Sequence, residues 1–257
     1  MVPPSQPSHG LPFICTDGSA DRHPRALARL FPVSTRGTDR RARLEAAHLY
    51  FVADRGGLER ALDGALRGGA DVVQLRDKTA SDAEIVAAAR WAAARCAAHG
   101  ALFIVNDRPD LAATVSADGV HVGQDDMPVA EARAIVGDDA IVGLSTHSIA
   151  QADAGAASGA DYIAVGPVHA TPTKEGRPAI GLDPVRHGAA HVDAVPWFAI
   201  GGIDPATVGA VVAAGARRAV VVRAIAHADD PEATTRQLRA ALSSGAVAPA
   251  GARRGAA

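Results

Sequence analysis

Gln74, Arg76 and Lys78 form the first group of residues in this chain that could bind a phosphorylated ligand. They alternate with a period of two, which in an extended segment directs all three side chains to the same side. Arginine offers a planar fork to phosphate oxygens and lysine a compact point charge, so the pair suits a diphosphate better than a carboxylate. An exposed charged turn after a strand is the alternative interpretation.

Two carboxylates, Asp107 and Asp126, each follow an apolar segment. Carboxylates with no arginine between them repel one another unless a cation lies there. Mg²⁺ prefers one or two carboxylates together with water and phosphate oxygens, and so suits a site that also binds a diphosphate. The pair therefore predicts a Mg²⁺ site, with a turn residue at Asp107 and a helix N-cap at Asp126 as the alternatives.

A second anion site is indicated further along the chain. Gly201 and Gly202 end one apolar segment, and Val222 and Arg223 end the next. Glycines let backbone N–H groups approach an anion, and this corner is the usual phosphate pocket of (β/α)₈ barrels. The pattern predicts a site for a monophosphate.

The rarest polar residues support one shared site. Of the 26 Lys plus Arg residues only Lys78 and Lys174 are lysines, and Asn106 is the only asparagine. All three follow predicted strands and fall on one predicted face. His121, His147 and His169 also follow or end such strands, but no two of them have the i, i+4 spacing of a zinc motif, so we expect them to be hydrogen-bonded scaffold.

The elements that must position these residues repeat along the chain. Eight apolar segments, each typical of a parallel strand buried on both faces, alternate with segments of helical composition; they are residues 48–54, 71–76, 101–107, 118–123, 140–145, 161–166, 196–202 and 218–223. Helix starts are predicted at the Ser81 and Glu84 capping box, at Asp204–Pro205 and at Asp230–Pro231. Eight units of about 24 residues predict a (β/α)₈ TIM barrel, with an open doubly wound sheet as the alternative.

The ends of the chain differ from this repeat. Residues 1–45 show no apolar period and are expected to be a flexible extension, apart from a short helix at 41–47. Residues 46–244 are expected to form a single barrel domain, and residues 245–257 a flexible tail.

A net charge of −2 and a pI near 6.5 exclude nucleic acid and anionic membranes as expected partners. Two cysteines without a disulfide pattern indicate a reducing cytoplasm. The oligomeric state stays open, a homo-oligomer included.

These residues stand in motifs that resemble those of the thiamine-phosphate synthase family. The motifs are Gln74-Leu75-Arg76-Asp77-Lys78, Val105-Asn106-Asp107, Gly119-Val120-His121-Val122-Gly123-Gln124-Asp125-Asp126, Gly143-Leu144-Ser145, Gly166-Pro167-Val168, Thr171-Pro172-Thr173-Lys174 and Ile200-Gly201-Gly202-Ile203. They occur in family order and spacing over about residues 48–243, so only the two ends of the chain lie outside the resemblance.

The resemblance implies a barrel transferase that condenses 4-amino-2-methyl-5-hydroxymethylpyrimidine diphosphate with 4-methyl-5-(2-hydroxyethyl)thiazole phosphate, forming thiamine phosphate and pyrophosphate. It places the pyrimidine diphosphate at Gln74, Arg76, Lys78, Asn106, Ser145 and Lys174, of which Arg76, Lys78, Ser145 and Lys174 would be catalytic. It places the thiazole phosphate at Thr171, Thr173, Gly201, Gly202, Val222 and Arg223, and the cofactor Mg²⁺ at Asp107 and Asp126. The implied mechanism is dissociative, through a pyrimidine cation.

Two positions depart from the family pattern. Arg223 stands where many members have serine, and His169-Ala170 replaces a more usual aromatic-proline pair.

Two other functions compete with the synthase. A thiazole tautomerase barrel would lack the paired aspartates and use a histidine such as His147, and a sensing barrel would bind thiamine phosphate without turnover.

Overall fold

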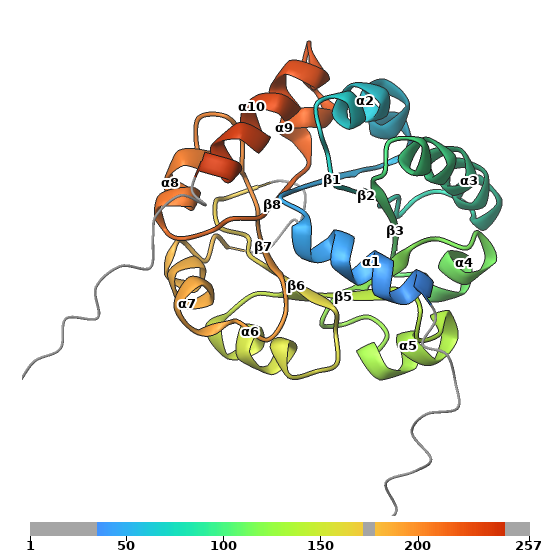
Figure 1. Cartoon of the computed structure of the whole chain (residues 1–257), viewed down its shortest axis with the longest axis horizontal. Helices are drawn as coiled ribbons and strands as arrows, with labels where there is room; N and C mark the ends of the chain where they lie inside the picture. Colours follow the sequence, from blue (N-terminus) through green and yellow to red (C-terminus); the bar gives the residue numbers. More distant parts are fainter. Residues whose placement is uncertain (1–34, 172–177, 245–257) are drawn as a thin grey trace, which may run out of the picture. The chain divides into compact units, whose positions relative to one another are not determined.

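The computed structural model describes residues 35–171 and 178–244. Eight parallel strands pair in the order of the sequence and close into a barrel, which confirms the predicted (β/α)₈ TIM barrel (Figure 1). The strands are β1 (Leu49–Ala53), β2 (Val72–Leu75), β3 (Leu102–Asn106), β4 (Gly119–Val122), β5 (Ile141–Thr146), β6 (Tyr162–Val165), β7 (Trp197–Ile200) and β8 (Ala219–Val221). Seven of them lie within a predicted apolar segment, and β5 extends one residue beyond its segment, to Thr146.

All helices but the first surround the strands (Figure 1). They are α1 (Thr35–Ala46), α2 (Arg55–Arg67), α3 (Asp82–Ala98), α4 (Pro109–Thr114), α5 (Val129–Val136), α6 (Ile149–Ala156), α7 (Asp183–His191), α8 (Val208–Ala213), α9 (Arg223–Ala226) and α10 (Pro231–Ser244). Within the described residues, none of these helices combines the length and the apolar character needed to cross a membrane.

Two of the three predicted helix starts are confirmed and one is wrong. Ser81 and Glu84 form the capping box of α3, and Asp230 accepts a hydrogen bond from the Ala233 N–H at the start of α10. Asp204 also accepts backbone N–H bonds, but they close a turn, and α8 begins only at Val208.

The strands are buried on both faces, which explains their continuous apolar sequence. Side chains alternate between the two faces of a strand. One set, which includes Leu49, Phe51 and Val73, packs beneath the helices. The other, which includes Tyr50, Val72 and Phe198, fills the inside of the barrel.

The folded part of the chain begins earlier than the sequence indicated. We expected a flexible extension to residue 45 with only a short helix at 41–47, whereas α1 begins at Thr35 and lies across one end of the barrel (Figure 1). Leu44 is buried with the inner residues of the barrel, and polar side chains hold the rest of the helix, such as Arg40, which pairs with Asp118 at 2.8 Å. Because charged rather than apolar residues dock most of this helix, it has no apolar period to detect.

Aspartates directly before three of the strands fasten this end of the barrel. Asp71, Asp118 and Asp161 precede β2, β4 and β6, and each accepts a backbone N–H from the strand before its own. Each also pairs with arginines, namely Arg239 with Asp71, Arg40 with Asp118, and Arg41 and Arg133 with Asp161. This contact gives a structural role to the Gly-Ala-Asp sequence that occurs at 69–71 and again at 159–161.

Asp161→Ala is expected to destabilise the barrel by about 2–3 kcal/mol, which lowers the melting temperature by about 5–10 °C. The change leaves the Val142 N–H, Arg41 and Arg133 without their common partner. Thermal unfolding measures the loss. The matched control is Asp63→Ala, which removes an exposed ion pair with Arg95 and should cost under about 1 kcal/mol. Equal effects of the two substitutions would contradict the role given to Asp161.

Candidate active site

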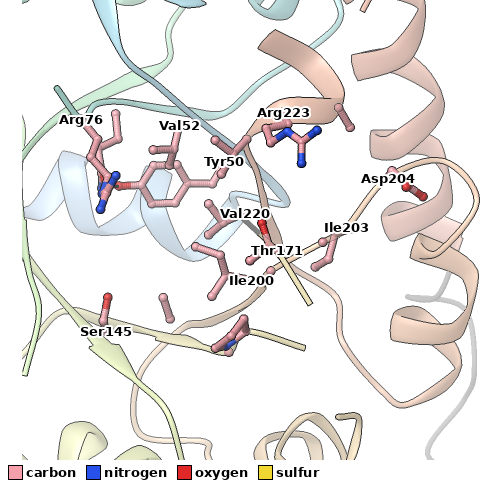
Figure 2. A pocket seen from close by; sticks show the side chains of 18 of the residues that line it. Tyr50, Val52, Arg76, Ser145, Thr171, Ile200, Ile203, Asp204, Val220 and Arg223 are labelled. Carbon is pink, nitrogen blue, oxygen red and sulfur yellow. Dashed lines mark hydrogen bonds between the residues drawn. The ribbon is translucent and has the colours of Figure 1, made fainter. Parts of the chain in front are cut away.

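The carboxyl ends of the strands surround a cavity of about 440 Å³. Nine of the predicted site residues line it: Gln74, Arg76, Asn106, Ser145, Thr171, Gly201, Gly202, Val222 and Arg223. Figure 2 shows Arg76 and Ser145 on one side and Arg223 on the other, with Tyr50 and Ile200 between them. The structure thus brings together residues from most of the predicted strand ends.

Lys78, Asp107 and Asp126 gather next to Asn106, outside the wall of the cavity. Lys78 Nζ lies 3.2 Å from Asp107 Oδ2, and the Asp107 carboxyl contacts that of Asp126. Burial and then the neighbouring Asp126 raise the pKa of Asp107, and the opposing effect of Lys78 is smaller. Two carboxyls that share a site in this way favour either a proton or a cation between them.

The alternative interpretations of the two aspartates have different outcomes. Asp107 does occupy a turn, because β3 ends at Asn106 and the φ of Asp107 is +59°, a conformation that aspartate tolerates better than most residues. The N-cap interpretation of Asp126 is wrong, since α5 begins at Val129 with no side-chain cap. Asp126 instead accepts the Gly123 N–H at 2.8 Å.

This donor set fits Mg²⁺. Asp107 and Asp126 would supply two carboxylates, and Mg²⁺ in phosphate-binding enzymes commonly takes one or two carboxylates together with water and phosphate oxygens. Among the residues that the structure describes, no group of three or more His, Cys, Asp or Glu side chains could hold a metal by itself. A metal at Asp107 and Asp126 would therefore have no third carboxylate, thiolate or imidazole ligand from the described residues.

Lys78 departs from the predicted alignment with Gln74 and Arg76. The strand ends at Leu75, so the period of two stops there. Asp77 then turns the chain, since its Oδ1 accepts the N–H groups of Thr79 and Ala80 at 3.1 Å and its Oδ2 binds Arg55 at 3.0 Å. Burial tends to raise the pKa of Asp77, but Arg55 and the turn outweigh it and hold the pKa at about 2. This ionised turn directs Lys78 to Asp107.

Close backbone packing forms the opposite side of the cavity. The N–H groups of Val168 and His169, in the segment between β6 and α7, donate to the carbonyls of Ile200 and Gly201. Gly201 and Gly202 have φ values of +110° and +62°, and a Cβ on Gly201 would lie 2.5 Å from Pro167. Only glycine suits this contact, which places both glycines on the cavity wall.

Three further predicted site residues lie between β6 and α7, and the structure describes only one of them. Thr171 lines the cavity. Thr173 and Lys174 lie outside the described residues, so their predicted roles stay predictions.

Sequence reasoning missed a hydrogen-bonded group inside the barrel. Gln74 Nε2 donates to Tyr50 Oη at 2.6 Å, and Tyr50 Oη lies 2.8 Å from Tyr162 Oη. His121 Nδ1 lies 2.9 Å from Tyr162 Oη, and His121 Nε2 lies 2.9 Å from Ser145 Oγ. The signal was present in the composition, because Tyr50 and Tyr162 are the only two tyrosines of the chain.

The three singled-out histidines have different surroundings. Both ring nitrogens of His121 are hydrogen-bonded, and His147 Nδ1 lies 2.6 Å from the Gly166 carbonyl oxygen, as expected of scaffold residues. The ring Nε2 of His169 is buried and has no hydrogen-bond partner in the described part of the chain. The backbone N–H of His169, rather than its ring, is hydrogen-bonded, since it donates to the Gly201 carbonyl.

The fold and the cavity together define a TIM barrel with a ligand-sized cavity at the carboxyl ends of its strands, where enzymes of this fold have their active sites. The family model of thiamine monophosphate synthase (TMP-TENI) matches residues 49–225. The thiamine-phosphate synthase of Saccharopolyspora erythraea is 52% identical over 213 residues, covering 79% of this chain and 96% of the relative. That of Thermobifida fusca is also 52% identical over 213 residues, covering 81% and 98%.

A solved structure extends this likeness to three dimensions. Thiamine phosphate pyrophosphorylase from Pyrococcus furiosus superposes with a TM-score of 0.71 at 33% identity, covering 80% of this chain and 98% of the other. The chain therefore belongs to the thiamine monophosphate synthase family and is a transferase of thiamine biosynthesis.

Proposed function

We propose that this enzyme condenses 4-amino-2-methyl-5-hydroxymethylpyrimidine diphosphate with 4-methyl-5-(2-hydroxyethyl)thiazole phosphate, in the presence of Mg²⁺, to give thiamine phosphate and pyrophosphate. One observation carries the proposal: a single cavity has Arg76 on one side and Arg223 on the other, with the Asp107–Asp126 pair beside Asn106. Two separate cations suit two phosphorylated substrates, and the carboxylate pair suits a metal that only one of them would share.

The pyrimidine diphosphate would bind on the side of Gln74, Arg76 and Ser145. The bond between its methylene carbon and the diphosphate oxygen breaks, and the electron pair leaves with the pyrophosphate. Arg76 and Lys78 would neutralise the charge that develops there, and Lys174 would add a third cation. Mg²⁺ bound at Asp107 and Asp126 would supply further charge neutralisation for the leaving group.

The thiazole phosphate would bind on the side of Gly201, Gly202 and Arg223, with Thr171, Thr173 and Val222 completing its pocket. Holding the phosphate there fixes the thiazole nitrogen in line with the pyrimidine methylene, so its lone pair forms the new C–N bond. The nitrogen carries no proton, so no general base is needed. Apolar wall residues, among them Val52, Ile200 and Val220, limit the water that could capture the cation first.

Pyrophosphate release tests the proposal directly. Purified full-length protein is incubated with both substrates and Mg²⁺, and pyrophosphate and thiamine phosphate are quantified. We expect equal amounts of the two products, and none when either substrate is omitted or when EDTA is added. Thiamine phosphate bound without turnover would favour a sensing barrel, and a metal-independent isomerisation of the thiazole would favour a tautomerase; either result would contradict the synthase.

Arg223→Ser is expected to raise the KM for thiazole phosphate by about tenfold and leave the KM for pyrimidine diphosphate unchanged. A hydrogen bond to a charged group contributes about 1.5–3 kcal/mol, and the exposed position of Arg223 places it at the lower end. Steady-state kinetics with each substrate varied in turn measures the effect. Arg67→Ser, which removes an exposed arginine paired with Glu232, is the control and should change neither KM.

A further inference from the structure

The buried hydrogen-bond chain inside the barrel joins two residues of the cavity wall. Gln74 and Ser145 both line the cavity, and the chain between them runs through Tyr50, Tyr162 and His121. Tyr162 is fully buried and does not line the cavity. It is the central link, which a ligand in the cavity would not touch.

The number of protons in this chain limits how it can be arranged. Burial raises the pKa of Tyr50 and of Tyr162, so each phenol keeps one proton to donate. While Gln74 Nε2 donates to Tyr50, the Tyr50 proton goes to Tyr162 and the Tyr162 proton goes to His121 Nδ1. A neutral imidazole that accepts at Nδ1 carries its proton on Nε2 and donates it to Ser145 Oγ.

In this order the two ends present opposite groups to the cavity. Gln74 has its acceptor, Oε1, outside the chain, and the proton of the Ser145 hydroxyl is directed to a partner other than His121. The reverse order needs the Gln74 amide turned over and every proton along the chain shifted, and it leaves Gln74 with an N–H and Ser145 with lone pairs. With a neutral imidazole, an arrangement with like groups at both ends leaves one buried hydrogen bond unmade, which is costly.

We propose that this chain, with Tyr162 as a positioning residue, couples the hydrogen-bonding polarity of Gln74 to the partner of Ser145 and thereby selects a ligand with an exocyclic amino group over its oxo counterpart. The inference rests on the proposed function, because it takes a phosphorylated pyrimidine as the ligand. A phosphate oxygen can only accept, so it requires the Ser145 proton. The chain then presents Gln74 Oε1, which accepts from an amino group and repels a carbonyl oxygen.

Equilibrium binding of two unreactive ligands tests the coupling. The monophosphates of the 4-amino and the 4-oxo hydroxymethylpyrimidine lack the pyrophosphate leaving group, and each is titrated into the full-length protein by calorimetry. We expect the wild-type protein to bind the amino ligand about 100-fold more tightly than the oxo ligand. Tyr162→Phe removes the central link and should reduce this preference to about tenfold or less, because Gln74 and Ser145 then orient independently.

A matched control separates this effect from general destabilisation. Thr146 is a buried residue of β5 whose hydroxyl donates to the Ala164 carbonyl at 3.0 Å, outside the chain. Thr146→Val should keep the wild-type preference. If Tyr162→Phe does not fold, Tyr50→Phe breaks the adjacent link and carries the same expectation.

The outcomes distinguish the inference from the function on which it rests. A wild-type preference retained in the folded Tyr162→Phe variant would overturn the coupling, as would equal binding of both ligands by the wild-type protein; neither would affect the proposed reaction. A wild-type protein that binds neither monophosphate would contradict the pyrimidine substrate itself.

Discussion

Asp107→Asn is expected to lower Mg²⁺-dependent kcat/KM by about 100- to 1,000-fold and to raise the melting temperature of the Mg²⁺-free protein at neutral pH. The activity is lost because metal neutralisation of a leaving group contributes several kcal/mol, and each 1.36 kcal/mol is a factor of ten in rate. The stability rises because the substitution removes a carboxylate held against Asp126. Asparagine suits the test since it also tolerates the φ of +59° at this position.

The stability effect of this substitution depends on pH in a defined direction. The pKa of Asp107 is raised in the folded protein. Below the ordinary pKa of aspartate, near 4, the carboxyl is protonated in both folded and unfolded states, so the unfavourable charge is absent. As the pH rises through the raised pKa, the folded wild-type protein loses stability that the asparagine variant keeps. Calorimetry in EDTA from about pH 4 to 8 should therefore show similar melting temperatures at the lowest pH. As the pH rises, the melting temperature of the asparagine variant should exceed that of the wild-type protein by an increasing amount.

Asp110→Asn is the matched control for Asp107→Asn. Asp110 lies three residues further along, and its pKa is lowered by Arg108, to which it is bound at 2.7 Å. The same substitution there removes a favourable charge, so the melting temperature should not rise and the Mg²⁺ titration of activity should not move. For Asp107→Asn, an unchanged Mg²⁺ titration or a lower melting temperature in EDTA would contradict the proposed metal site.

The barrel could be predicted because each of its strands is buried on both faces. Val72 and Val73 face opposite sides of β2, one into the barrel and one toward the helices, and both are fully buried. Burial on both faces leaves an uninterrupted apolar segment that is easy to detect. Helix α1 has no such signal, because arginines rather than an apolar face attach it to the barrel.

The candidate-site residues that could be placed correctly from the sequence are those that lie on strands. Gln74 lies within β2 and Asn106 ends β3, and both reach the cavity as the carboxyl ends of parallel strands require. Lys78 lies beyond the strand, and its direction depends on the Asp77 turn and on Arg55, which binds Asp77 from 22 residues earlier in the chain. Contacts of this kind are set by the tertiary structure and leave no local pattern.

The buried tyrosines show a second limit of local pattern. Tyr50 and Tyr162 stand in apolar segments, where an aromatic residue indicates only core packing. Their hydroxyls meet because β1 and β6 lie across the closed barrel from one another, with Tyr50 and Tyr162 ring centroids 5.9 Å apart. Only the closure of the sheet reveals that these residues are polar partners of Gln74 and His121.

Gly143→Ala is expected to destabilise the protein by about 1–3 kcal/mol, although it adds one methyl group to a strand. A Cβ on Gly143 would lie 2.1 Å from Cζ and 2.4 Å from Oη of Tyr162, the residue that it faces on the neighbouring strand. Tyr162 has little room to move, because it packs against Tyr50 and Phe198 with ring centroids 5.9 and 5.6 Å away. Gly143 thus provides the space in which the tyrosine pair sits.

Thermal unfolding of single and double variants tests this packing argument. Gly143→Ala should lower the melting temperature by about 3–10 °C. Gly209→Ala, on a helix where an added Cβ meets nothing within 4 Å, should leave it unchanged or raise it. Tyr162→Leu removes the atoms that clash, so Gly143→Ala with Tyr162→Leu should be less destabilised than the sum of the single variants. Additive losses would show that the cost of the methyl group arises elsewhere than at Tyr162.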